Sequence, residues 1–188
     1  MPPKVKISKK DIVQTALTLC RERGESAVNA RSIAEALGCS TQPVFSNFAT
    51  MEELQKDVLV AAYELYQSFL REEIERGQCP PYKAMGMAYI RFAKEEKQLF
   101  RLLFMCDRSN QEMEYAPDFT AAVEIIMNNN NVSREKAERM HMELWAFVHG
   151  IGTMMATSFF VPEWDMVSDM LSDVYHGLHA KHLQEETV

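Results

Sequence analysis

The sequence predicts an all-α protein of about nine helices, divided into a small N-terminal domain and a larger C-terminal helical bundle. Only 7 glycines and 7 prolines occur among 188 residues, so few positions interrupt a helix. Apolar residues make up 47% of the chain and recur at steps of three and four, which is the spacing of one helix face. We expect the two domains to cover residues 1–50 and 51–188.

Three short helices are expected in the first domain. Ser8 can cap the first, over residues 8–24, and Asn29 can cap the second, over residues 29–38. The third is expected over residues 40–48. A short helix, a tight turn and a second helix too short to pack alone form the layout of a helix-turn-helix motif.

Longer helices are expected in the second domain. Thr50 and Glu53 have the spacing of a capping box, which opens a helix at about residue 51. Loops are expected over residues 107–117 and 128–131. The helices of this domain are expected over residues 51–76, 82–107 (two helices that meet near 94–97), 119–127, 133–160 and 163–182.

Charge is distributed unevenly along the chain. Residues 1–48 hold seven Lys and Arg against four Asp and Glu, whereas residues 49–188 hold thirteen against twenty-three. The net charge of −7 therefore conceals a basic N-terminal end and an acidic body. Such a chain is oriented on a polyanion, because one end is attracted and the other is repelled.

Other features narrow the class of protein. The first ten residues are polar and basic, and no apolar run approaches the roughly 20 residues of a membrane span. The four cysteines are far apart in the sequence and form no CxxC pair. We therefore expect a reduced, cytoplasmic chain with no membrane partner, no metal and no cofactor.

The helix expected over residues 40–48 presents side chains suited to reading double-stranded DNA. Gln42 and Asn47 can each bond N6 and N7 of an adenine, which is worth about 1–3 kcal/mol of discrimination. Thr41 and Val44 can touch thymine methyl groups. Asn29, Arg31 and the basic arm at residues 4–10 are placed to bind phosphates. The expected DNA-binding residues are Lys9, Lys10, Asn29, Arg31, Ser40, Thr41, Gln42, Pro43, Val44, Phe45, Ser46 and Asn47.

The N-terminal segment resembles the TetR (tetracycline-repressor-like) family over about fifty residues. The residues that carry the resemblance are Ile12, Ala16, Gly24, Arg31 to Ser40, Val44 to Phe48, Glu53 and Leu54. The resemblance implies transcription regulation by a DNA-binding domain joined to a helical domain for ligand binding and dimerisation. Two residues depart from the family pattern: Phe45 replaces a usual tyrosine, and Met51 stands where a lysine is common. Both changes remove typical phosphate contacts, so affinity would depend more on the arm and on Arg31.

A second segment, Trp145-x3-His149-Gly, resembles a motif in one C-terminal class of the same family. Trp145 and His149 lie on one helix face and would give an apolar wall with one polar handle. Eleven of the 13 methionines lie between residues 85 and 170, and methionine lines adaptable apolar pockets. The alternative is that these residues are ordinary core. The expected site for an unknown apolar or aromatic effector is Tyr89, Phe92, Phe104, Met105, Trp145, His149 and Met154.

A homodimer is expected because one short helix reads few bases, whereas two-fold pairing doubles the contacts on a palindromic operator. The last two helices can form a four-helix seam with a partner. The expected interface residues are Gly152, Ala156, Met166, Met170 and Val174.

Two rival classes remain open at this point. A helical-bundle metalloenzyme is suggested by Glu138-x-x-His141, which is half of a di-metal signature whose second half is absent. The spacing of His176, His179 and His182 could also chelate a metal. The second rival keeps the fold but acts as an activator, or under a protein partner, with no small ligand. We expect a repressor that a small ligand releases from DNA.

Overall fold

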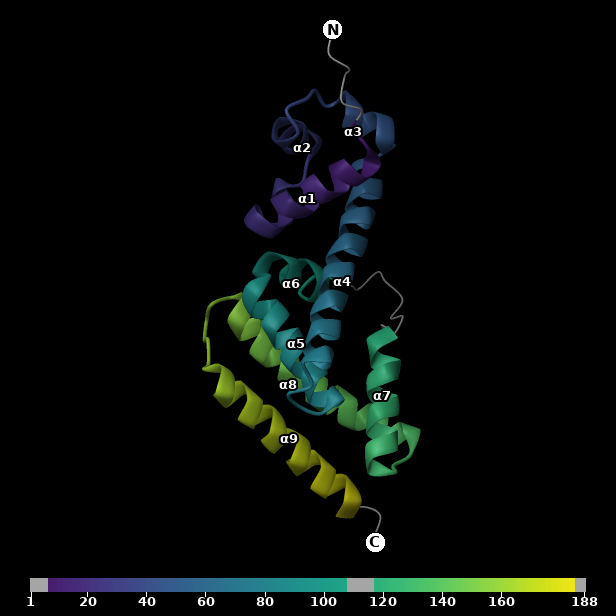
Figure 1. The fold of residues 1–188 in the computed structure, drawn as a ribbon, viewed down its shortest axis with the longest axis vertical. Helices are drawn as coiled ribbons and strands as arrows, with labels where there is room; N and C mark the ends of the chain where they lie inside the picture. Colours follow the sequence, from purple (N-terminus) through teal and green to yellow (C-terminus); the bar gives the residue numbers. More distant parts are fainter. Residues whose placement is uncertain (1–6, 108–116, 185–188) are drawn as a thin grey trace. The chain divides into compact units, whose positions relative to one another are not determined.

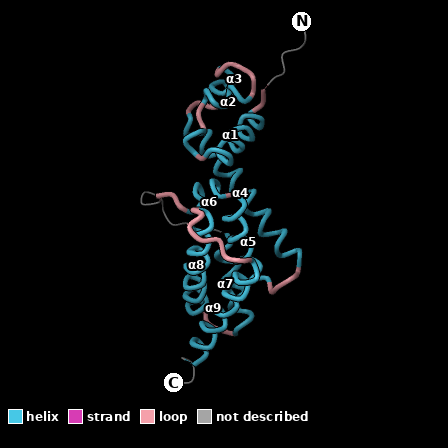
Figure 2. Tube along the Cα trace, turned by 90° about the vertical axis from the view of Figure 1, so that its left-hand side faces the viewer, coloured by secondary structure: helices cyan, strands magenta, loops and turns pink. Residues whose placement is uncertain are grey.

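The computed structural model of the chain describes residues 7–107 and 117–184, together with the side chains of residues 7–107 and 119–181. Every regular element in this part is a helix, and Figure 2 shows no strand among the described segments. Figure 1 labels the α-helices. Their bounds are α1 Lys9–Arg23, α2 Ala30–Ala36, α3 Gln42–Asn47, α4 Met51–Arg76, α5 Pro81–Glu95, α6 Lys97–Phe104, α7 Pro117–Asn130, α8 Arg134–Ala156 and α9 Trp164–Gln184, with a 3-10 turn at Glu25–Ala27. The all-α fold is confirmed.

The chain divides into two compact units. The first, which we call the head unit, contains residues 1–67 and 96–106, and the second, the body unit, contains residues 68–95 and 107–188. Helix α6 therefore belongs to the head unit although it follows α5 in the sequence. A functional boundary between residues 50 and 51 stays a prediction.

The head unit is organised around α1, which packs against α2, α3 and α6. Ser8 caps α1 in a full capping box, because its hydroxyl accepts from the Asp11 N–H and the Asp11 carboxylate accepts from the Ser8 N–H. Gly24 ends α1 with a φ of 87°, a backbone conformation that residues other than glycine rarely adopt. Ile12 and Ile33 are fully buried between these helices.

The body unit is built on α5, which packs against α7, α8 and α9. One of its core clusters consists of Met87, Ile90, Ile151, Met155, Val167 and Leu171. Gly86 permits this packing, because a Cβ there would lie 2.8 Å from a methyl of Leu171. A second cluster joins α7 to α8 through Val123, Ile126, Val132, Ala137 and Met140. The buried methionines in these two clusters, Met87, Met140 and Met155, are core residues. This agrees with the alternative that the methionines belong to the core and do not line a pocket.

Two predicted helix ends are wrong. Helix α7 continues through the expected loop to Asn130, whose side-chain amide donates to the Ile126 carbonyl at 2.8 Å, and Asn131 then takes a φ of 53°. Helix α8 ends at Ala156 rather than near residue 160, because Ser158 adopts a φ of 57° and turns the chain. The loop expected over residues 107–117 and the arm residues Lys4 and Lys6 lie almost entirely outside the described residues.

Candidate functional site

Helix α3 is held in the head unit by its apolar side and leaves its other side exposed. Val44 is fully buried and Phe48 is 2% exposed, so these two residues, four apart, anchor the helix. Phe45 is 56% exposed. The expected positions Ser40, Thr41, Gln42 and Ser46 are also exposed, and Pro43 lies in the first turn, where its missing N–H costs little.

The prediction that Val44 touches DNA is wrong, because its side chain lies in the core of the head unit. Two other predicted readers bond to their own helix. The Ser46 hydroxyl donates to the Gln42 carbonyl, and the Asn47 amide donates to the Pro43 carbonyl, each at 2.8 Å. Helix α3 therefore presents Gln42 as its one exposed amide side chain, with Thr41 and Phe45 beside it.

Asn29 serves as a helix cap. Its side-chain oxygen accepts the Ser32 N–H at 3.0 Å and the Ser32 hydroxyl at 3.2 Å, while its amide donates to the Ala27 carbonyl at 3.4 Å. Phosphate binding by this side chain would have to compete with the cap. Arg31 and Lys10 are exposed, as a phosphate contact requires.

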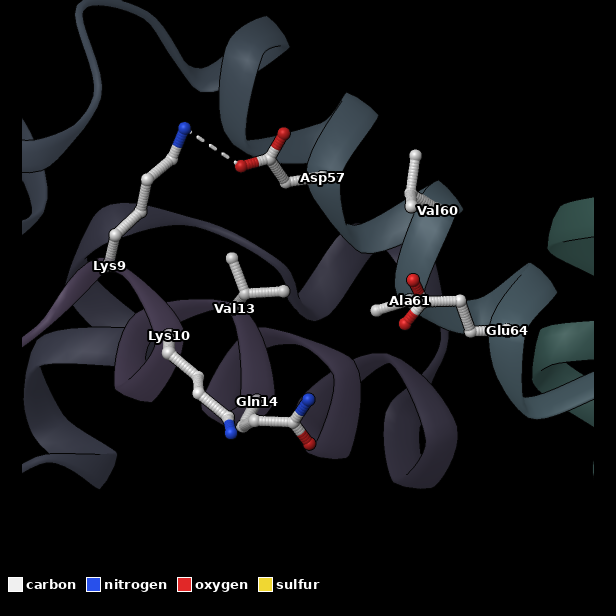
Figure 3. A pocket seen from close by; sticks show the side chains of 8 residues that line it. All are labelled: Lys9, Lys10, Val13, Gln14, Asp57, Val60, Ala61 and Glu64. Atoms are coloured by element: carbon white, nitrogen blue, oxygen red, sulfur yellow. Dashed lines mark ion pairs between the residues drawn. The ribbon is translucent and has the colours of Figure 1, made fainter.

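Lys9 joins the start of α1 to α4. Its ammonium lies 2.9 Å from Asp57 and 3.4 Å from Glu53, and it sits 4.7 Å from the centre of the Phe48 ring. The Asp57 hydrogen bond is the main reason that the pKa of Lys9 is raised. Because these carboxylates already satisfy Lys9, a phosphate would have to displace them. Figure 3 shows the ion pair between Lys9 and Asp57 beside an open pocket. The volume of this pocket is about 370 Å³. The pocket is lined by Lys9, Lys10, Val13, Gln14, Asp57, Val60, Ala61 and Glu64.

Three of the expected effector residues come together in the body unit. The Tyr89 hydroxyl lies 2.8 Å from Nδ1 of His149, and the Trp145 ring stacks on His149 with centroids 5.0 Å apart and planes 19° apart. Burial lowers the pKa of His149, which favours the neutral imidazole, and Nδ1 of that form can accept a hydrogen bond from the Tyr89 hydroxyl. Trp145 is 41% exposed, which gives this group an open aromatic face.

The other expected effector residues do not join this group. Phe92 is fully buried with its ring edge-on to Phe69 at 5.2 Å, and Met154 packs on the core cluster of α5, α8 and α9. Phe104 and Met105 belong to the head unit, where Phe104 packs against Tyr66. None of the seven lines the pocket between α1 and α4. A single cavity shared by all seven is therefore not supported.

Comparison with known proteins decides the family. The tetracyclin repressor-like C-terminal domain family matches residues 82–176, which span α5 to α9. The chain belongs to the TetR family of transcriptional regulators. Its fold is also similar to the ketosteroid transcriptional regulator KstR2 of Mycobacterium tuberculosis, with a TM-score of 0.52 and 13% sequence identity over 93% of this chain and 96% of that chain. No curated protein matches the sequence.

A second tyrosine–histidine pair in this TetR-family chain was missed by sequence reasoning. The Tyr82 hydroxyl lies 2.9 Å from Nδ1 of His141, and burial lowers the pKa of His141 to about 4. The sequence signal for both pairs is a matched spacing. Tyr82 and Tyr89 are seven residues apart on α5, and their partners His141 and His149 are eight apart on α8. Within the described part of the chain, no three His, Cys, Asp or Glu side chains gather as a metal site. The His182 side chain lies outside that part.

The expected dimer residues fall into two groups. Gly152 and Ala156 are already buried in the single chain, so the prediction that they face a partner is wrong. Met170 packs partly on the core cluster, and Val174 is half-buried. Met166 is 50% exposed. The TetR-family dimer itself stays a prediction. None of the described helices is long and apolar enough to cross a membrane.

Proposed function

We propose that this TetR-family regulator is a cytoplasmic repressor that binds a palindromic operator as a homodimer through α3. The observation that carries the proposal is the two-sided character of α3. Val44 and Phe48 fix the helix in the head unit, while the side chains of Gln42 and Phe45 are exposed and outside the core. A helix of six residues has no packing reason to carry a solvent-facing aromatic ring, whereas a DNA-reading helix does.

The internal hydrogen bonds of α3 limit what it can read. The Ser46 hydroxyl and the Asn47 amide bond to backbone carbonyls of α3, and Asn47 is half-buried, so the exposed amide of Gln42 is the side chain best placed for a bidentate bond with adenine. Thr41 and Phe45 supply apolar contacts for thymine methyl groups. We therefore expect a half-site in which one adenine dominates and its neighbours are thymine-rich.

We infer that affinity for DNA depends on few phosphate contacts. Arg31 and Lys10 are exposed and available, whereas Lys9 is held by two carboxylates and Asn29 caps α2. Each phosphate that is neutralised contributes about −0.9 to the slope of log affinity against log salt. A dimer that uses only Arg31 and Lys10 from each protomer would show a slope of about −4.

The proposed effector is an uncharged aromatic or apolar molecule that stacks on the exposed face of Trp145. Neutral His149 and the Tyr89 hydroxyl provide polar handles without a net charge, so a charged effector would find no counter-ion among these three residues. To move operator occupancy from 99:1 to 1:99, the effector must prefer the released state by about 5.5 kcal/mol.

A second candidate function keeps DNA binding but removes the small ligand, so that the chain acts as an activator or under a protein partner. The observation that favours it is the packing of the body unit, where Phe92 and Met155 are fully buried core residues. Addition of aromatic compounds to the protein–operator complex separates the two candidates, because only the first releases DNA.

The experiment that tests the proposal is selection of duplexes from a randomised pool by the full-length protein, followed by titration of the selected duplex across a salt series. The expected result is one palindromic consensus, bound tightly, with affinity that falls as salt rises. Arg134→Ala, which alters an exposed ion pair in the body unit, is the control and should bind as the wild type does. Absence of any consensus, with equal weak binding to all duplexes, would refute the proposal.

A further inference from the structure

Helix α1 helps to hold the proposed reading helix, α3, in place in the head unit. It packs against both α2 and α3, and Ile12, Ala16, Leu19 and Cys20 are buried on its inner face. A rotation of α1 therefore carries α3 with it, and whatever holds α1 contributes to the geometry that DNA meets.

The two ends of α1 are held differently. At its start, Lys9 bonds to Asp57 and Glu53 of α4, in an arrangement in which all three side chains are more than a third exposed. At its end, Arg21 is paired with Glu96, which directly precedes α6 and is 3% exposed. Exposed pairs contribute little and yield to salt, whereas a buried carboxylate cannot leave its partner without a large penalty.

The geometry of the buried end is specific. The Arg21 guanidinium donates from Nε to one oxygen of Glu96 and from Nη2 to the other, which is the two-pronged arrangement that arginine makes and lysine cannot. The Glu96 carbonyl accepts the Phe100 N–H at 2.8 Å, so the same residue starts α6. Close by, Gly24 lies against the Gln98 side chain, where a Cβ would meet Oε1 at 3.3 Å. The end of α1 and the start of α6 are thus in close contact within one unit.

We propose that Glu96 is a positioning residue for DNA binding, which acts by holding α1 through the two-pronged bond with Arg21. The proposal rests on the proposed function, since it concerns affinity for the operator. It assigns a role in DNA binding to a residue that lies 45 positions after the start of α4 in the sequence. Arg21 itself is not required to touch DNA in this arrangement.

The test compares full-length variants on the duplex selected by the wild type. Glu96→Gln keeps the shape of the side chain and removes its charge, Arg21→Lys keeps the charge and removes the fork, and Arg21→Ala removes both. We expect each to weaken binding by about tenfold, with the double variant Arg21→Ala/Glu96→Gln no worse than the singles because they act as one unit. Glu138→Gln, which breaks the exposed Arg134–Glu138 pair, is the matched control and should bind within twofold of the wild type.

Two readouts separate positioning from general damage. Stoichiometric titration gives the active fraction, which misfolding lowers and a positioning defect leaves at the wild-type value. The salt slope should be unchanged in Arg21→Ala, whereas loss of a phosphate contact would reduce it by about 0.9 per site. If Glu96→Gln does not fold, Arg21→Lys carries the test, since that side chain is 55% exposed.

Affinities within twofold of the wild type for the Arg21 and Glu96 variants, at full active fraction, would overturn the inference and leave the proposed function standing. A reduced salt slope in Arg21→Ala would overturn it in a different way, by making Arg21 a direct DNA contact. Failure of the wild type to select any duplex would remove the proposed function, and the inference with it.

Discussion

Replacement of Phe45 by tyrosine should strengthen binding to DNA. A gain in affinity is a stringent test, because nonspecific damage to the protein would lower the affinity. The Phe45 ring is 56% exposed on α3, so a hydroxyl at its tip meets solvent rather than the core. In the TetR family a tyrosine is usual at this position. We therefore expect Phe45→Tyr to leave the fold intact and to restore one hydrogen bond to a phosphate.

The size of the gain follows from that exposure. Net of exchange with water, a hydrogen bond contributes about 0.5–1.5 kcal/mol, and more when its partner is charged; for the exposed tip of this side chain we use about 1 kcal/mol per protomer. Two protomers on one operator would gain about 2 kcal/mol, which is about thirtyfold in affinity. The tyrosine is neutral, so the slope of log affinity against log salt should not change.

Fluorescence anisotropy on the selected duplex measures this change. Phe159→Tyr is the matched control, because that ring is 83% exposed in the body unit and should leave affinity unaltered. Equal or weaker binding by Phe45→Tyr would refute the reasoning. A different result is that Phe45→Tyr binds more weakly than the wild type on the selected duplex but equally well when uracil replaces thymine. That result would indicate that the phenyl ring contacts a thymine methyl.

Three further predictions concern single side chains. Gln42→Ala should lose about 1–3 kcal/mol of discrimination at one base pair in each half-site. A duplex with 7-deazaadenine at that position should bind the wild type more weakly and leave the affinity of the variant unchanged. An equal loss of discrimination at every position would contradict this prediction. Tyr89→Phe removes the hydroxyl that bonds His149 and should lower the free energy of unfolding by about 1 kcal/mol in urea titrations, and no change would show that the bond contributes nothing. His141, with a pKa of about 4 against 6.5 when unfolded, should make the protein less stable as pH falls below 6.5, because the unfolded state binds the proton first. The loss between pH 7 and pH 5 should be about 1–2 kcal/mol after allowance for partial exposure, and His141→Gln should remove it; an unchanged pH dependence in that variant would assign the effect to other groups.

The sequence predicted the architecture well because long helices carry their own signals. The capping box of Ser8 and Asp11, and the run of apolar residues at helical spacing in α4, depend on residues close in the sequence. The helix-turn-helix is predictable for the same reason: Asn29 caps α2, and Gly38, with a φ of 65°, lies in the turn that follows that helix.

Short helices and side-chain hydrogen bonds were harder to predict. Helix α3 has only six residues, too few for periodicity to show which side is buried, and Val44 was therefore placed outside although it shares a face with Phe48. Whether Ser46 and Asn47 bond to bases or to their own backbone depends on rotamers that a sequence does not specify. Helix α7 extends through Asn130 because that side chain bonds the helix, overriding the low helix propensity of asparagine.

Within the group of Tyr89, Trp145 and His149, only the contact between two residues of one helix follows from a local sequence pattern. Trp145 and His149 are four residues apart on α8, so their contact follows from helix geometry. Phe104 and Met105 are expected in the same site, but the division into units places them in the head unit. Tertiary grouping of this kind depends on the path of the chain, which no local pattern contains.

The measurement that tests the account most directly is a hydroxyl-radical footprint of the wild-type protein on its selected duplex. A homodimer that inserts one α3 into each of two successive major grooves should protect two patches about 10 base pairs apart, related by two-fold symmetry. Gln42→Ala should weaken both patches equally. A single asymmetric patch, or protection that spreads evenly along the duplex, would contradict the proposed dimeric reading of DNA by α3.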